Sequence, residues 1–439
     1  MHIINKKELS RTPLREKALL IAEAGYDAID IEKAVSQKIK FQNNKLSIAK
    51  GITGEYLEFD LSDYKKVFLI GIGKGSSLAV MTLAGILAPL GSRFSGGIAL
   101  DIKIPNKSQS SNSKIEFLTG THPIPSKQNI EATQKIIKLV KSLDENDLLI
   151  AFICGGGSAL FCCSEQESEE SALAIKFLTK AGADIFELNT IRKHLSECKG
   201  GGLAKTAYPA TVISLIASDV CGNDLSIIAS GPTVFDETTK KDAEKVLQKY
   251  ELDLNQFHLS ETPKDKKYFE KVKNILFVCN QDAISAMVEK AKEIGFEPRI
   301  YSLELRGEAK DVLIPMIKEV KSGEAILAGG ETTITLGSGP TGKGGRNMES
   351  VLGAITNFQE VLPHGVVALS MASDGRDNTE AAGAIVDAST QEKTKELGLS
   401  PEEFLENHSS FNFFEKTGDL IFTDQKSFNI ADLMVILKI

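Results

Sequence analysis

Two glycine-rich stretches are the parts of this 439-residue chain best suited to chemistry. GIGKGSS (71–77) follows an apolar run at 67–72, and CGGGSAL (154–160) follows another at 147–153. Glycines between a strand and a helix let backbone N–H groups approach a phosphate, and the helix N-terminus adds partial positive charge. Lys74 adds a full charge. The stretches predict an anion site that includes Gly71, Gly73, Gly155, Gly156, Gly157 and Ser158.

These loops do not match the standard nucleotide-binding motifs. In GIGKGSS, Ser76 replaces the third glycine of G-x-G-x-x-G, and Arg93 stands near the position of the ribose-binding acid. The later stretch 337–350 has the G-x-x-x-x-G-K spacing, but Gly344 replaces the Ser or Thr that binds Mg²⁺. Arg346 follows at the start of an expected helix, where a cation opposes the helix dipole and so indicates an anionic partner. A tight turn with a solvated lysine is the alternative for the first loop.

Further charged residues follow apolar runs. The stretch 188–204 is basic in an acidic protein and contains Arg192 and Lys199. SDVCGND (218–224) and SDGRDN (373–378) offer the carboxylates Asp219, Asp224, Asp374 and Asp377. Carboxylates at strand ends can hold Mg²⁺ or accept a hydroxyl proton. The alternative for each is a structural aspartate whose carboxylate only accepts hydrogen bonds from the backbone of its own turn.

Composition argues against several classes of protein. The chain has 51 basic and 59 acidic residues, a net charge of −8, which disfavours a general nucleic-acid binder. The N-terminus lacks the apolar region of a signal peptide, and no apolar run approaches twenty residues, so we expect a cytoplasmic protein without a membrane span. The six cysteines form no C-x-x-C pair and predict buried reduced thiols, not a zinc or iron–sulfur site.

Apolar runs alternate with helical patterns, as in parallel sheets covered by helices. We expect a two-domain α/β protein: a Rossmann-like parallel sheet flanked by helices in residues 1–255, and an α/β domain with a mixed sheet in residues 272–439. The polar stretch 236–273 indicates an exposed helix and a linker. The expected strands are 67–72, 147–153, 211–217, 274–279, 298–303, 325–328, 332–336, 366–371 and 381–386, and helical patterns cover the first forty residues and 282–295.

Eight stretches together resemble the glycerate 2-kinase family that ends in a MOFRL domain. They occur in the family's order between about residues 14 and 387, and they are GIGKGSS, THPIPSKQN, GGGSAL, LNTIRKHLSECKGGGLA, SDVCGNDLSIIASGPT, GGETT, GKGGRNMES and SDGRDNTEAAGAIVD. The resemblance implies a site between two domains and phosphoryl transfer from ATP, with Mg²⁺, to the 2-hydroxyl of D-glycerate. The product would be 2-phospho-D-glycerate.

The resemblance and the local chemistry together assign three sets of residues. The catalytic set is Lys74, Arg192, Arg346 and Asp374, with Lys74 and Arg346 as the principal substrate and phosphate contacts. The binding set adds Lys199, Glu331 and Asn347 to the glycine loops. The metal set is Asp219, Asp224 and Asp377. Which aspartate binds metal and which acts as base stays open.

The chain departs from the family at several positions. Asn223, Met348 and Asn378 stand where Asp, Gln and Gly are usual, and TDQKSFN (423–429) replaces a loop rich in Gly and Thr. A silent relative, or one with a different small hydroxy acid as acceptor, is therefore the first alternative. An NAD-dependent hydroxypyruvate reductase is the second alternative, although this chain lacks the third glycine and the ribose-binding acid of the dinucleotide-binding motif. The oligomeric state, a homodimer included, stays open.

Overall fold

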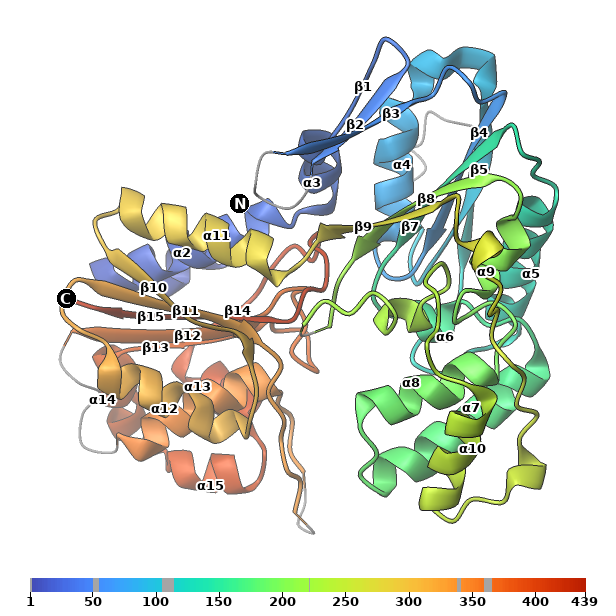
Figure 1. Ribbon diagram of the computed structural model, residues 1–439. Helices are drawn as coiled ribbons and strands as arrows, with labels where there is room; N and C mark the ends of the chain where they lie inside the picture. The colour runs from blue at the N-terminus through green and yellow to red at the C-terminus, as the bar shows by residue number, and fades with distance from the viewer. Residues whose placement is uncertain (1, 50–54, 105–113, 221, 338–340, 359–364) are drawn as a thin grey trace. The chain divides into compact units, whose positions relative to one another are not determined.

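The structure is a computed structural model that describes residues 2–49, 55–104, 114–220, 222–337, 341–358 and 365–439 (Figure 1). Contacts divide the chain into two compact units. Ala34–Val278 is called the parallel-sheet unit below, and Met1–Lys33 with Cys279–Ile439 is called the mixed-sheet unit. Each unit has its own sheet, helices and core, and each is described by itself.

Six parallel strands form the centre of the parallel-sheet unit. In spatial order they are β6 (Ile115–Thr119), β5 (Phe94–Asp101), β4 (Lys66–Ile72), β7 (Asp147–Ile153), β8 (Thr211–Ala217) and β9 (Val272–Val278). Every residue of β7 is buried, as expected for an unbroken apolar run covered on both faces. The order is that of the doubly wound Rossmann fold, and it reverses between β4 and β7, where such sheets bind ligands at their carboxyl ends.

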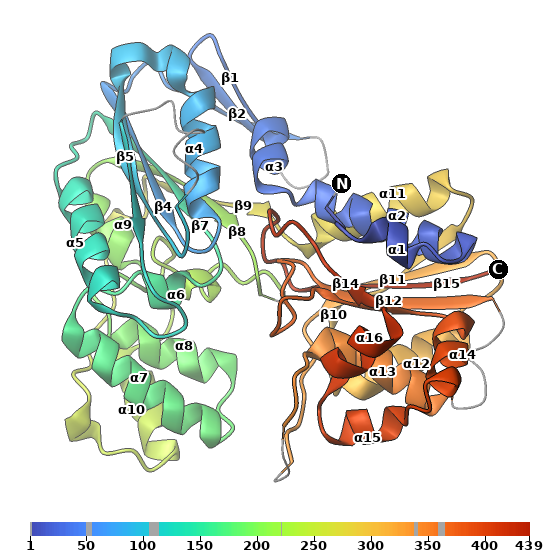
Figure 2. The ribbon, with the colours of Figure 1, turned by 180° about the vertical axis from the view of Figure 1, so that it is seen from behind.

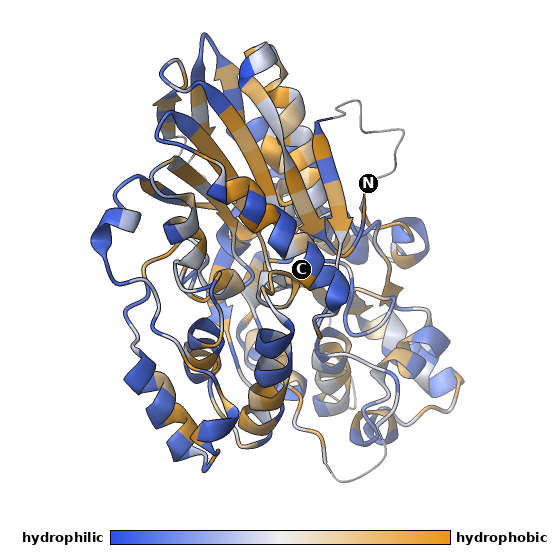
Figure 3. Ribbon diagram, turned by 90° about the vertical axis from the view of Figure 1, so that its right-hand side faces the viewer, coloured by the Kyte–Doolittle hydropathy of each residue, from blue (hydrophilic) through white to orange (hydrophobic). Residues whose placement is uncertain are grey.

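Helices cover both faces of this sheet. Helix α4 (Ser76–Ile86) lies on one face, and α5 (Lys127–Lys141) with α9 (Gly202–Ala207) lies on the other (Figures 1 and 2). In Figure 3 the strands of this sheet are mostly coloured as hydrophobic. A small antiparallel sheet consists of β1 (Ile39–Gln42), β2 (Lys45–Ala49) and β3 (Tyr56–Asp60).

A separate layer of helices lies beyond the carboxyl ends of the strands. It contains α7 (Glu165–Lys180), α8 (Ile185–His194) and α10 (Lys240–Lys249), and the short α6 (Gly157–Leu160) follows β7 directly. The helices of the layer pack around buried apolar side chains that include Leu178, Ile191 and Leu247. Residues of this layer form one wall of the site described below.

The mixed-sheet unit also has six strands. Their order is β10 (Glu297–Leu305), β11 (Glu324–Gly330), β15 (Asp432–Lys438), β12 (Val366–Ala372), β13 (Gly383–Val386) and β14 (Leu420–Ile421). Only the β10–β11 pair is parallel. Helices α2 (Pro13–Ala28) and α11 (Asn280–Glu293) cover one face. The other face carries α12 (Ala309–Glu319), α13 (Arg346–Asn357), α14 (Ala388–Glu396), α15 (Pro401–Glu406) and α16 (Ser410–Thr417).

The α/β class and the two kinds of sheet are confirmed, but the units differ from the predicted ranges 1–255 and 272–439. Helix α2 belongs to the mixed-sheet unit, where Gly25 packs so closely that a Cβ there would lie 2.8 Å from Met287 Sδ. Strand β9 completes the parallel sheet instead of opening a second domain. The polar stretch 236–273 is therefore not a linker: its helix α10 buries Ala243 and Leu247 within the parallel-sheet unit.

The strands predicted at 67–72, 147–153 and 211–217 are β4, β7 and β8. The strand predicted at 332–336 is wrong, because only an isolated bridge between Glu308 and Thr333 forms there. Within the described part of the chain, no helix has the length and apolar character needed to cross a membrane.

Candidate functional site

The two glycine loops meet at the carboxyl ends of β4 and β7. The backbone N–H of Gly73 donates to Leu100 O at 3.1 Å, and that of Lys74 donates to Gly155 O at 2.9 Å. Gly73 has a φ of +115°, and a Cβ there would lie 2.5 Å from Cys154 O, so a side chain has no room. The loops are therefore bonded to each other at the point where the strand order reverses.

The N-terminus of α4 already holds a carboxylate. Asp101, at the end of β5, accepts the N–H of Ser77 on Oδ2 at 3.0 Å. Burial raises the pKa of Asp101, although the N–H groups of Ser77 and Gly75 that point at its carboxylate oppose the shift. This corrects the prediction for the first loop: its helix N-terminus binds Asp101, the N–H of Gly73 is committed inside the fold, and Gly71 lies within β4.

A cavity of about 600 Å³ opens beside the second loop. Its walls come from α6, α7, α8 and the loop that carries His122. Its polar lining residues include His122, Gly156, Ser158, Glu167, Asn189, Arg192, Lys199 and Asp219. Four of the predicted site residues from the parallel-sheet unit, Gly156, Ser158, Arg192 and Lys199, are thus brought to one cavity, together with Asp219 from the predicted metal set.

Two basic side chains, His122 and Arg192, line this cavity, and a third, Lys74, lies beside the same glycine as His122. A Cβ on Gly156 would lie 3.2 Å from both His122 Cδ2 and Lys74 Cγ, so these two side chains flank the same glycine. Desolvation, together with the positive charges of Lys74 and Arg192, lowers the pKa of His122 to about 4. Burial likewise lowers the pKa of Arg192. His122 is therefore neutral at pH 7, and both cations lie near enough to lower its pKa.

Neither Lys74 nor Arg192 has an anionic partner among the described residues, since no hydrogen bond or ion pair joins either side chain to any of them. Like charges held close together without a counter-charge repel, and an anion between them removes that cost. The arrangement therefore favours a ligand with a carboxylate or phosphate group.

Hydroxyl and amide groups also lie at the cavity. Ser158 Oγ lies 2.9 Å from Ser230 Oγ, and Ser230 Oγ donates to Asn189 Oδ1 at 2.8 Å. Ala229 and Ser230 have φ values of +50° and +59°, a left-handed backbone that costs of the order of 1–3 kcal/mol per residue and that often marks functional sites. The sequence analysis missed Ser230, Asn189 and Ala229, although IASGPT was within a matched stretch.

Lys199 is in the cavity wall but it is not available as a free cation. Its ammonium forms an ion pair with Glu167, and both side chains are almost fully buried. Burial alone would lower the pKa of Lys199, but the adjacent Glu167 outweighs it and raises the pKa. Glu167 also accepts the N–H of Cys163 at 2.7 Å. Lys199 is therefore held within the wall by its carboxylate partner.

The two aspartates of SDVCGND have different surroundings. The carboxylate of Asp219 lies on the glycine loop, because a Cβ on Gly155 would fall 2.1 Å from Asp219 Oδ2. Asp224 is exposed and accepts the N–H of Ser226 at 2.9 Å, as in a local turn. Among the described residues, neither belongs to a group of three ligands placed to hold an ion. The structure thus has no pre-formed metal site at these residues.

Arg346, in the mixed-sheet unit, has partners within that unit. Its Nε donates to Asp432 Oδ2 at 2.6 Å and a terminal nitrogen donates to Asp432 Oδ1 at 3.1 Å. The other terminal nitrogen donates to Glu331 Oε1 at 2.6 Å. The anionic partner that the sequence predicted for Arg346 is therefore Asp432, a residue that the sequence analysis did not select. Glu331 lies beside Arg346, and its place in the binding set stays a prediction.

Asp377 is a helix cap. Its Oδ2 accepts the N–H of Met348 in the first turn of α13 at 2.8 Å, and the side chain of Asn347 donates to Asp432 Oδ1 at 2.9 Å. Burial raises the pKa of Asp377 to about 7, and Asp432 adds to the shift. The carboxylate is thus buried and bonded to the helix start, and its role as a metal ligand stays a prediction. Asn347 is also fully buried.

Asp374 lies in a turn that contacts the altered loop 423–429. Its Oδ1 accepts the N–H of Arg376 at 3.0 Å, and Arg376 Nε donates to Gln425 Oε1 at 3.0 Å. Gly375 lies against Thr423, whose Oγ1 would be 2.1 Å from a Cβ at that glycine. The departure from the family pattern at 423–429 therefore adjoins a residue of the predicted catalytic set. The catalytic role of Asp374 stays a prediction.

A doubly wound sheet with a cationic cavity at its switch point, in a chain that also has a mixed-sheet α/β unit, defines an α/β enzyme that handles a small anion. Family models agree with this class. Residues 17–259 match a domain of unknown function, DUF4147, and residues 324–432 match the MOFRL family. The chain belongs to the glycerate 2-kinase family.

Individual relatives support this membership. A D-glycerate 2-kinase of Thermotoga maritima is 37% identical over 73% of this chain and 79% of its own length. A glycerate 2-kinase of Pyrococcus horikoshii is 32% identical over 96% of this chain and 97% of its own length. A protein of Agrobacterium vitis provisionally named hydroxypyruvate reductase is 35% identical over 74% of this chain and 77% of its own length. A crystal structure of glycerate kinase from Thermotoga maritima superposes with a TM-score of 0.80 at 31% identity, covering 96% of this chain and 99% of that one.

Proposed function

We propose that this enzyme transfers the γ-phosphoryl group of ATP to the 2-hydroxyl of D-glycerate, with Mg²⁺, and releases 2-phospho-D-glycerate. The relatives named glycerate 2-kinase support the reaction. The structural observation that carries the proposal is the pair of cations, Lys74 and Arg192, which have no anionic partner among the described residues and both act on a neutral His122. Phosphoryl transfer depends mainly on positioning and on neutralising negative charge, and these residues supply both.

Each residue of the cavity has a chemical task in this proposal. Lys74 and Arg192 bind the carboxylate or phosphate oxygens that enter between them. His122 is unprotonated at pH 7, so its free ring nitrogen can accept a hydrogen bond from a substrate hydroxyl. Bound negative charge would also raise the pKa of His122 and make it a better proton acceptor as the substrate arrives.

Arg346 and Asp374 of the mixed-sheet unit serve the same reaction in this proposal. Arg346 is oriented by Asp432 and Glu331, and its guanidinium keeps about a third of its surface exposed, 31%. Asp374 is the proposed acceptor of the hydroxyl proton or a ligand of Mg²⁺. Mg²⁺ commonly takes one or two protein carboxylates and draws its other ligands from nucleotide phosphates and water. The absence of a pre-formed three-carboxylate site among the described residues is consistent with that mode.

A hydroxypyruvate reductase is the second candidate, favoured by the name of the relative from Agrobacterium vitis. Dinucleotides place their pyrophosphate at the N-terminus of the first helix of a Rossmann sheet. In this chain Asp101 occupies that position on α4, and its carboxylate would repel the pyrophosphate. We therefore favour the kinase.

One pair of assays separates the candidates. ADP release is measured with MgATP and a panel of small hydroxy acids, and NADH oxidation is measured with hydroxypyruvate. The kinase proposal expects ADP release that depends on D-glycerate and no NADH oxidation. NADH oxidation without ADP release would support the reductase. ADP release that occurs only with a different hydroxy acid would support a kinase with another acceptor.

A further inference from the structure

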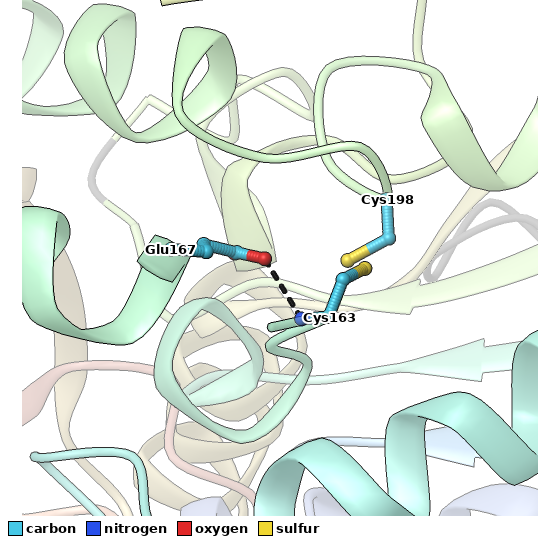
Figure 4. A group of neighbouring side chains, drawn as sticks. All are labelled: Cys163, Glu167 and Cys198. Atoms are coloured by element: carbon cyan, nitrogen blue, oxygen red, sulfur yellow. Dashed lines mark hydrogen bonds between the residues drawn. The ribbon is translucent and has the colours of Figure 1, made fainter. Parts of the chain in front are cut away.

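Three ligand-type side chains form a group that the proposed reaction does not use, and one of them, Glu167, lines the cavity (Figure 4). Cys163 precedes α7, Glu167 lies in the first turn of α7, and Cys198 follows α8. One ligand atom from each, two sulfurs and a carboxylate oxygen, lie within 4.8 Å of one another. Figure 4 shows the two sulfurs side by side. The cysteines are 35 positions apart in sequence, so their spacing gave no sign of a metal site.

We propose that Cys163, Cys198 and Glu167 bind a thiophilic divalent cation of the zinc class, with one coordination position open to the cavity. Zinc in proteins is four-coordinate, with Zn–S bonds of about 2.3 Å, which hold two thiolates about 3.8 Å apart. The three ligand atoms need to approach by only about 1 Å to reach this geometry. Three protein ligands leave the fourth position free, and Glu167 itself lines the cavity through which an ion can enter.

The charges at the site balance with and without the ion. In the empty site Glu167 and Lys199 neutralise each other. When a divalent ion binds, each thiol loses its proton to water and forms a bond to the metal, so two positive charges enter and two protons leave. The net charge of the buried group stays at zero, which avoids the cost of an uncompensated buried charge.

The ion shares Glu167 with Lys199. Cys198 is fully buried. Because a metal binds thiolates and releases their protons, affinity should fall as pH falls. The proposed site differs from the sequence analysis, which expected buried reduced thiols and no zinc ligation.

The test uses fully reduced, metal-free protein titrated with Co²⁺, whose thiolate complexes absorb in the near ultraviolet. We expect one equivalent to bind with this absorption and Zn²⁺ to displace it. Cys163→Ser and Cys198→Ser should each weaken binding by at least about 100-fold. Cys279→Ser is the matched control, because Cys279 caps α11 in the mixed-sheet unit and serine is a good helix cap.

A second measurement on the unmodified protein makes the result independent of whether the variants fold. Cys163 is partly exposed, so iodoacetamide should alkylate it, and one equivalent of Zn²⁺ should protect it, as read by peptide mass spectrometry. No thiolate absorption with Co²⁺, or absorption unchanged in both cysteine variants, would overturn the proposal. So would equal alkylation of Cys163 with and without Zn²⁺. None of these readouts requires turnover, so they stand apart from the proposed kinase reaction.

Discussion

The guanidinium of Arg346 donates two hydrogen bonds to the buried carboxylate of Asp432, with N–O distances of 2.6 and 3.1 Å. This paired geometry is strong and directional, and it fixes the guanidinium at the start of α13. The partner is 86 residues away in the sequence. Arg346 therefore has a structural role in the mixed-sheet unit in addition to any role in the reaction.

Arg346→Ala should lower both activity and stability. Removal of one member of a buried ion pair leaves the other charge uncompensated, which costs about 3–5 kcal/mol. Urea unfolding measures the stability and initial rates measure kcat/KM. Adding Asp432→Asn to Arg346→Ala should recover much of the stability without recovering activity, and equal recovery of both would mean that Arg346 acts only through the fold.

Lys74→Ala should lower activity and leave stability nearly unchanged. Lys74 has no ion-pair partner among the described residues, so its removal breaks no such contact. We expect a loss of about 100-fold in kcat/KM, roughly 3 kcal/mol of transition-state stabilisation. Lys66→Ala, at the exposed start of β4, is the control and should be close to wild type. Normal turnover by Lys74→Ala would exclude this lysine from the site.

The pKa of His122 reports on the charge around it. The positive charges of Lys74 and Arg192 help to hold it near 4, so a bound anion that offsets them should raise it. Lys74→Ala should raise it for the same reason. An NMR titration of the imidazole, with and without inorganic phosphate, measures the shift. If phosphate inhibits turnover but leaves the pKa of His122 unchanged at the same concentration, the anion binds elsewhere.

Activity should require a hard divalent cation, with Mn²⁺ able to replace Mg²⁺ and no requirement for Zn²⁺. Phosphate and carboxylate oxygens are the ligands that such ions prefer, whereas the cysteine group offers two sulfurs and suits a softer ion. Exhaustive chelation should abolish turnover and added Mg²⁺ should restore it. Full activity in the chelated enzyme would contradict the proposed role of the ion.

The sequence predicted features that local patterns encode. Unbroken apolar runs that end in glycine loops indicated β4 and β7, and the basic stretch placed Arg192 near them. Features that depend on distant pairing were not predictable. Asp101 caps the start of α4, although it lies 24 residues after Ser77, whose N–H it accepts. Nothing in the sequence around Asp101 marks it as a helix cap.

The aspartates show the same limit. An aspartate at a strand end has the same local pattern whether it caps a helix, as Asp377 does, or lies beside a glycine loop, as Asp219 does. The helical pattern of α2 likewise shows which face is apolar but not which sheet that face covers. Asp432, within the last strand, carries no motif that would single it out, and only its contact with Arg346 reveals its importance.

The central claim is tested most directly by the identity of the product. The enzyme is incubated with MgATP and D-glycerate, and the phosphorylated acid is identified by ³¹P–¹H correlation NMR, which shows the carbon that bears the phosphate. We predict 2-phospho-D-glycerate, formed one for one with ADP by wild type and at least about 100-fold more slowly by Lys74→Ala. Phosphate on the 3-hydroxyl, or ADP formed at the same rate without any acceptor, would contradict the account.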